Sequence, residues 1–157
     1  MSIGLAVTWA SLLAGGLAVA ASAHADDRRG HATPPTMNRT MKIEFTSNGK
    51  TATADLVDSS ATRDFIALLP MTLTLEDYAS TEKISPLPKR LSTDGAPPGI
   101  TPVAGDLAYY APWGNLALFY KDFRYSEGLV RLGHIETGLD VLVTRMPLEV
   151  VIKRVEP

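Results

Sequence analysis

The residues best suited to contact a ligand form one aromatic run, GDLAYYAPWGNLALFYKD, from Gly105 to Asp122. Trp113 lies in a Pro-Trp-Gly segment of this run, and its ring could stack against a ligand ring or a proline. The same aromatic residues could instead fill a small barrel, with Trp113 closing one end, and we favour this packing role. Asn115 could either hydrogen-bond a bound molecule or close its own turn. If the run binds a ligand, the predicted contacts are Tyr110, Trp113, Asn115, Phe119 and Tyr120.

Two other groups of polar residues suggest metal or acid–base chemistry. Glu76, Asp77 and Glu82 are three carboxylates in a short segment, and hard cations bind such clusters. The central glycine of a calcium loop is missing, so we expect a solvated acidic loop and no metal site. His134 has no cysteine or second histidine near it, which leaves too few ligands for a transition metal. A Gly-x-Ser-x-Gly segment is also absent, so we expect a structural or surface histidine and predict no catalytic residue.

Composition narrows the classes of partner. The chain has 157 residues, a net charge of −2 and no cysteine. This balanced charge gives no basic footprint for nucleic acid, and the lack of cysteine excludes disulfides and thiol catalysis. The sequence also has no glycine-rich phosphate loop, and no cofactor is predicted.

The N-terminal segment has the composition of an export signal. Residues 1–25 carry no charged side chain, are mostly apolar or small, and end in the small-x-small sequence AHA. We therefore predict a signal peptide cleaved before Asp26 and an exported domain, periplasmic or secreted, that is free of the membrane after cleavage. No Lys or Arg precedes the apolar stretch, so an uncleaved anchor is the alternative. Residues 26–40 are predicted to be a flexible spacer before a domain at 41–157.

The spacing of apolar residues predicts the elements of that domain. MKIEF and TATADL alternate on either side of an Asn-Gly turn, which indicates a β-hairpin. Capping residues at Asp58–Ser60 precede apolar residues that suit a short helix, which must end by Pro70. The segment Glu76–Ile100 is rich in proline and glycine, and we expect mostly loop there, with an extended piece at 89–92. Further strands are expected at 71–75, 106–111, 115–121, 130–135 and 148–155, with a helical turn at 137–143.

This pattern predicts a mainly β fold, an antiparallel barrel or sandwich with one or two short helices. Four segments also carry a family resemblance: LPMTLTLEDYASTEKI, LPKRLSTDGAPPG, GDLAYYAPWGNLALFYKDF and SEGLVRLGHIETGLDVL. Together they resemble the bacterial cyclophilin-like family of small β-barrel proteins, over about residues 41–142. The resemblance implies a closed antiparallel β-barrel of about eight strands, capped by helices.

The resemblance implies little about activity, because most members of the family have no known function. Cyclophilins themselves are prolyl isomerases with an arginine in a Phe-His-Arg segment and a glutamine before two aromatic residues. This chain has no Phe-His-Arg and no glutamine, so no catalytic residue carries over. Four arginines could supply the donor that twisting a prolyl bond requires, and no motif selects one: Arg63, Arg90, Arg124 and Arg131.

Three functions therefore remain open. We expect a non-catalytic module that binds a small molecule or an extended peptide through the aromatic run. A prolyl isomerase of the cell envelope is the alternative from the enzyme class. The third is an assembly module whose aromatic surface joins two copies of the chain.

Overall fold

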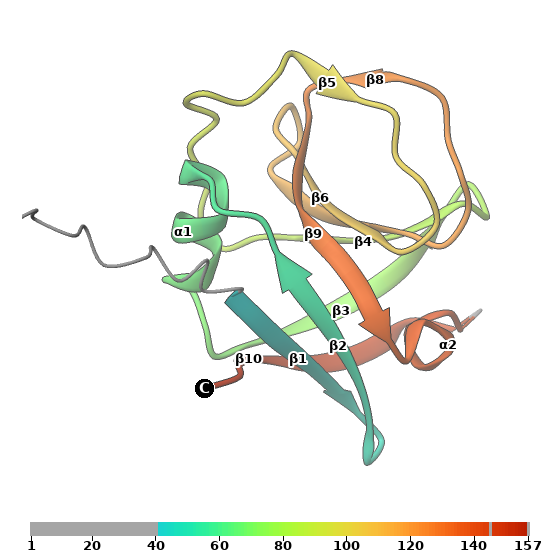
Figure 1. Ribbon diagram of the computed structural model, residues 1–157. Helices are drawn as coiled ribbons and strands as arrows, with labels where there is room; N and C mark the ends of the chain where they lie inside the picture. The colour runs from blue at the N-terminus through green and yellow to red at the C-terminus, as the bar shows by residue number, and fades with distance from the viewer. Residues whose placement is uncertain (1–40, 145, 157) are drawn as a thin grey trace, which may run out of the picture. The chain divides into compact units, whose positions relative to one another are not determined.

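The computed structural model describes residues 41–144 and 146–156, and most of its strands close into one antiparallel barrel (Figure 1). The predicted signal peptide and spacer lie outside the described residues. Around the barrel the strands follow the order β1-β10-β3-β4-β7-β6-β9-β2, and β5 and β8 form a separate two-stranded sheet. The elements are β1 (Met41–Ser47), β2 (Lys50–Leu56), α1 (Ser60–Ile66), β3 (Met71–Tyr78), β4 (Glu82–Pro86), β5 (Gly99–Ile100), β6 (Asp106–Tyr110), β7 (Asn115–Phe119), β8 (Ser126–Glu127), β9 (Leu129–Thr137), α2 (Leu139–Leu142) and β10 (Leu148–Arg154).

The first hairpin and helix form where the sequence predicts them. Asn48 and Gly49 join β1 to β2 with φ of 48° and 74°, the positive values that a two-residue hairpin turn requires. Ser59 caps α1, because its side-chain oxygen accepts a hydrogen bond of 3.1 Å from the backbone N–H of Thr62. The predicted closed barrel, the hairpin and the short helices are all confirmed.

Side chains fill the interior of the barrel. Residues that alternate along the strands, such as Phe45, Leu107 and Leu116, are fully buried in one apolar cluster. Phe65 of α1 and Leu142 of α2 join this cluster, and Figure 1 shows the two helices at opposite ends of the barrel. The interior is therefore a packed core, and a binding site must lie on the outer wall or at a rim.

Strand β7 is buried on both faces, as its sequence predicts. Leu116 and Leu118 point into the barrel core, while Ala117 and Phe119 belong to a second apolar cluster on the outer wall. Such a strand needs cover on its outer face. The chain that follows β7 supplies part of it, since Phe123 packs against the second cluster.

The prediction that Glu76–Ile100 is mostly loop is partly wrong. Strand β3 continues to Tyr78, and residues 82–86 form β4, which pairs with both β3 and β7. The extended piece expected at 89–92 is not a strand, although Leu91 is buried there. The alternation of β4 is disguised because its inward position holds a charged residue, Lys83, where a core residue is expected.

Lys83 is fully buried and has polar partners at the end of the barrel. Its ammonium donates to the backbone oxygen of Thr144 and lies 3.4 Å from a carboxylate oxygen of Asp77. These contacts replace the hydration that the ammonium loses on burial. A charged residue can therefore occupy an inward position on β4.

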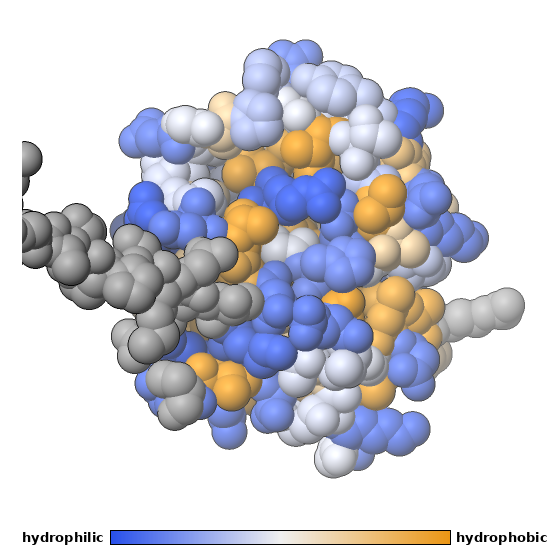
Figure 2. All heavy atoms as spheres, viewed as in Figure 1, coloured by the Kyte–Doolittle hydropathy of each residue, from blue (hydrophilic) through white to orange (hydrophobic). Residues whose placement is uncertain are grey.

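The molecular surface is mixed in character. Figure 2 shows a face on which hydrophobic residues lie in separate patches among hydrophilic ones. This face has no broad apolar surface of the kind that permanent subunit contacts bury. Within the described residues, no helix has the length and apolar character needed to span a membrane.

Candidate functional site

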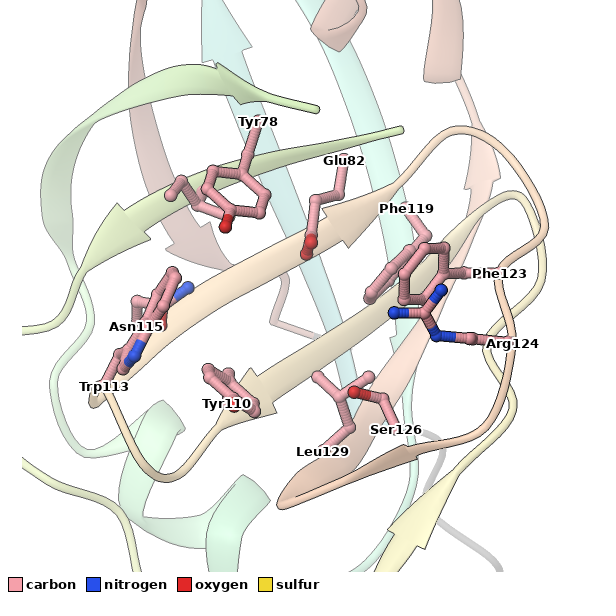
Figure 3. A pocket seen from close by; sticks show the side chains of 11 residues that line it. Tyr78, Glu82, Tyr110, Trp113, Asn115, Phe119, Phe123, Arg124, Ser126 and Leu129 are labelled. Atoms are coloured by element: carbon pink, nitrogen blue, oxygen red, sulfur yellow. The ribbon is translucent and has the colours of Figure 1, made fainter. Parts of the chain in front are cut away.

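A cavity of about 240 Å³ opens on the outer wall of the barrel, over β4, β7, β6 and the beginning of β9. Figure 3 shows the side chains of these strands and of two connections converging on it. Its lining combines five aromatic rings with a few polar groups. The lining residues are Tyr78, Glu82, Ile84, Tyr110, Trp113, Asn115, Phe119, Phe123, Arg124, Ser126 and Leu129.

Strand register explains why the outer wall is hollow at this place. Ala117 of β7 lies opposite Ile84 on one neighbouring strand and opposite Ala108 on the other. The two alanines fill little space on the outer face, while larger side chains stand further along the same strands. One of these, Tyr110, pairs with Leu129 at one end of β6. The alanines therefore form a shallow apolar floor, and the larger side chains form the walls around it.

Trp113 forms part of the wall and does not fill the barrel. Its ring stands nearly perpendicular to those of Tyr78, at 5.6 Å between centroids, and Tyr110, at 5.3 Å. The side chain is 58% exposed, so the predicted packing role inside the barrel is wrong. Tyr109 fills that role instead, because it is buried in the core and its hydroxyl accepts a hydrogen bond from the backbone N–H of Leu91.

The opposite wall is built by Phe119 and Phe123, whose rings stack with their centroids 6.2 Å apart. The guanidinium of Arg124 lies over the Phe123 ring at 5.1 Å from its centroid, a cation–π geometry. Figure 3 shows Arg124 beside Phe123 at this end of the cavity. A cation is thus held at the rim next to an apolar surface.

Arg124 differs from the other arginines proposed from the sequence. To the other residues that the structure describes, it makes no hydrogen bond and no ion pair. The other three have partners within the chain: Arg63 pairs with Asp58, Arg90 donates to the backbone oxygen of Ala111, and Arg131 pairs with Asp106. No sequence motif distinguishes the four arginines, and the geometry of the cavity singles out Arg124.

Two groups in the cavity, Glu82 and Asn115, have carboxyl or amide oxygens that accept no hydrogen bond from the described residues. Glu82 is half-buried, and loss of hydration raises the pKa of its carboxyl to about 7. Asn115 donates from Nδ2 to the backbone oxygen of Leu116 at 3.1 Å, which fixes its amide orientation because that oxygen can only accept. This contact is local, but it does not close the turn before Asn115, which is closed by the hydrogen bond from the backbone N–H of Gly114 to the backbone oxygen of Tyr110. Its Oδ1 is buried and has no hydrogen-bond partner among the described residues.

Tyr120, the fifth predicted contact, lies outside this cavity. Its hydroxyl donates to Asp77 at 2.6 Å, and the two line a different hollow of the surface. Burial, and then the nearby Asp77 carboxylate, raise the pKa of Tyr120 to about 12. The hydrogen bond from Tyr120 is the main cause that lowers the pKa of Asp77.

The expectation of a solvated acidic loop at Glu76–Glu82 is also wrong in part. Asp77 and Glu82 lie on paired strands, the first tied to Tyr120 and Lys83 and the second half-buried in the cavity. Within residues 41–144 and 146–156, no three His, Cys, Asp or Glu side chains are grouped closely enough to hold a metal ion.

His134 is a half-exposed residue with a carboxylate partner, in agreement with the predicted structural or surface role. Its Nδ1 lies 3.0 Å from Asp106 Oδ1, and the same carboxylate accepts from Arg131 at 2.8 Å and from the backbone N–H of Val103 at 3.0 Å. Asp106 is fully buried. It therefore ties β6 to β9 and to the preceding loop.

The sequence thus identified four of the lining residues: Tyr110, Trp113, Asn115 and Phe119. It missed the contributions from β3, β4 and the connection after β7, including Tyr78, Glu82 and Arg124. EKISP has no apolar–polar alternation that would predict a strand, because Lys83 and Ser85 occupy its inward positions and Glu82 and Ile84 its outer face. With β4 recognised, pairing to β7 would bring Glu82 to the aromatic run.

Comparisons with known proteins agree with the barrel. The solution structure of the hypothetical protein AF2241 from Archaeoglobus fulgidus is 19% identical, with a TM-score of 0.52 over 74% of this chain and 95% of that one. McbB, solved in complex with tryptophan, is 17% identical, with a TM-score of 0.51 over 73% of this chain and 44% of that one. At these identities both likenesses establish the fold alone. A search of curated proteins found no significant match. The model of the cyclophilin-like family matches residues 45–153, so the chain belongs to the cyclophilin-like family.

Proposed function

We propose that the domain is a binding module that takes a small organic molecule with an apolar or aromatic body in the outer-wall cavity. The observation that carries this proposal is the composition of the cavity, in which aromatic walls surround the half-buried carboxyl of Glu82 and the buried Oδ1 of Asn115, which has no partner among the described residues. Small-molecule sites have this character, mostly apolar with a few convergent polar groups.

The exposed position of Trp113 supports the same function. In the empty protein more than half of this aromatic side chain, 58%, is still exposed to water. A ligand between Trp113 and the Phe119 wall would bury both surfaces and gain the free energy of that burial. That McbB, which shares the fold, was solved with tryptophan bound also favours a small-molecule ligand.

Thermal stability with simple probes tests this function. We expect that 2-phenylethanol, phenethylamine or 3-phenylpropionate raises the melting temperature of the full chain, by about 5 °C at roughly ten times the dissociation constant. Glycerol at the same concentration serves as the polar control. In a Trp9→Phe chain, Trp113 is the single remaining tryptophan, so its emission should change on titration with an active probe. The proposal fails if none of the three phenyl compounds shifts either signal.

A second candidate, a prolyl isomerase of the cell envelope, is favoured by one specific observation. Arg124 lies beside the apolar surface of Phe119 and Phe123, and its guanidinium could donate to a prolyl nitrogen as the amide twists. An active isomerase would relax an X-Pro peptide faster than the uncatalysed time of tens to hundreds of seconds. The Arg124→Lys variant would then slow relaxation at least tenfold, roughly the effect of one lost donor to the reacting group. Relaxation at the uncatalysed rate eliminates this candidate.

A further inference from the structure

The carboxyl of Glu82 is the acidic group of the cavity. Along the sheet Glu82 lies between Tyr78, its partner on β3, and Phe119, its partner on β7. Figure 3 shows its carboxyl pointing toward the middle of the cavity. Among the described residues it has no hydrogen bond and no ion pair. A half-buried carboxylate in this position gains from any donor that a ligand brings.

The charged neighbours of Glu82 do not neutralise it. Lys83, next along β4, points into the barrel, where it contacts Asp77 and Thr144. The guanidinium of Arg124 lies over Phe123 at the rim, without an ion pair to Glu82. The charged form of Glu82 is therefore without a direct ion-pair partner among the described residues.

A second group in the cavity also calls for a donor. Asn115 is almost fully buried, and its Oδ1 has no partner in the described part of the chain. Its Nδ2 is already used by the backbone oxygen of Leu116. Both the carboxylate and the amide thus offer acceptor oxygens, and a ligand that satisfies them must carry N–H or O–H groups.

The aromatic rings around these acceptors suit a cation. Trp113 stands edge to face with both Tyr78 and Tyr110, at interplanar angles of 86° and 80°, so ring faces in different directions border one space. The negative potential on the faces of such rings attracts organic ammonium groups. An anion is repelled by these ring faces and by the Glu82 carboxylate, and Arg124 at the rim is the one cationic group among the lining residues that it would meet.

We infer that the cavity binds an organic amine, whose ammonium donates to Glu82 while its apolar or aromatic body fills the space between Trp113 and Phe119. This inference rests on the proposed binding function and names the ligand class for it. Asn115 Oδ1 is the second acceptor for a ligand with a further N–H or O–H group.

Three phenyl probes of similar size and different charge test the inference on the full chain. Phenethylamine is a cation, 2-phenylethanol is neutral and 3-phenylpropionate is an anion. At about pH 8 we expect calorimetry to give phenethylamine an affinity roughly tenfold above that of 2-phenylethanol, as for one hydrogen bond to a charged group. The anion should bind more weakly than either.

The Glu82→Gln variant tests whether Glu82 is the group that recognises the positive charge of the ligand. We expect it to lose the preference for phenethylamine and to keep the affinity for 2-phenylethanol, because glutamine preserves size without charge. Glu149→Gln, on the exposed face of β10, is the matched control and should leave both affinities unchanged. A retained affinity for 2-phenylethanol also shows that the Glu82→Gln chain has folded.

Affinity as a function of pH gives an independent readout. With a carboxyl pKa of about 7 in the empty site, the charged form of Glu82 is lost as the pH falls. Affinity for phenethylamine, which stays cationic, should therefore fall as the pH drops through about 7, by roughly tenfold in all, toward that of 2-phenylethanol, and should level off above pH 7. Affinity for 2-phenylethanol should stay flat.

The outcomes separate this inference from the proposed function. If 2-phenylethanol binds as tightly as phenethylamine, or the anion binds best, the amine inference is overturned while the binding function stands. If no phenyl probe binds at all, the binding function fails, and the amine inference fails with it. An amine preference that survives in Glu82→Gln also overturns the assignment.

Discussion

Replacing Trp113 with alanine is expected to weaken the binding of both phenethylamine and 2-phenylethanol by roughly tenfold or more. The ring forms one wall of the cavity and makes edge-to-face contacts with Tyr78 and Tyr110. Its removal opens that wall to water and takes away the apolar surface that a ligand would bury. Titration calorimetry of the full chain gives both affinities directly.

The fold itself should tolerate the Trp113→Ala change. Because the side chain is 58% exposed, we expect the free energy of unfolding to change by less than about 1 kcal/mol. Met146→Ala removes another large exposed apolar side chain, which is not part of the cavity, and should leave both affinities intact. Unchanged binding in Trp113→Ala would show that the aromatic wall is no part of a site.

The second large effect is expected on stability. Asp106→Ala should lower the free energy of unfolding by about 3 kcal/mol, as measured by urea denaturation, because a buried ion pair and two further hydrogen bonds are lost together. Arg131 and His134 are partly exposed, so water can hydrate them once the carboxylate is gone. The backbone N–H of Val103 is left without its partner.

Two comparisons identify the cause of that loss. Asp94→Ala removes an exposed carboxylate whose oxygens make no hydrogen bond to the described residues, and should cost less than about 0.5 kcal/mol. Asp106→Asn keeps an acceptor for the backbone N–H of Val103, so its loss in the free energy of unfolding should lie between those of Asp106→Ala and Asp94→Ala. If Asp106→Ala is as stable as Asp94→Ala, the tie between β6 and β9 contributes nothing to the barrel.

The parts of the fold that depend on local pattern could be predicted from the sequence. Alternating residues in β1 and β2, with an Asn-Gly turn between them, dictate a hairpin with one buried face. The two-sided apolar pattern of β7 dictates a strand that is covered on its outer face. Many such strands predict a barrel or a sandwich, the family resemblance implies the closed barrel, and the structure has one.

The parts that depend on pairing between distant segments could not be predicted. Lys83 hides the period of β4, because it occupies a buried position where an apolar residue is expected. Its burial depends on contacts with Asp77 and Thr144, and the sequence does not show that these residues lie close to it. The position of Trp113 depends on which side of the sheet its turn folds over, which composition does not determine. Glu82 joined the site only through the pairing of β4 with β7.

The export of the chain remains a prediction, since residues 1–40 lie outside the described part. The predicted ligand contacts are likewise unmeasured. The structure groups four of the five predicted contacts around one cavity and places Tyr120 elsewhere, against Asp77.

Nuclear magnetic resonance of the full chain with phenethylamine tests the central claim most directly, because each amide reports its own surroundings. A ligand in the outer-wall cavity predicts that the largest shifts occur at Tyr78, Glu82, Tyr110, Asn115 and the indole N–H of Trp113. Shifts that gather instead around Asp77, Tyr120 and Lys121, or the absence of any shift at saturating probe, would contradict the account.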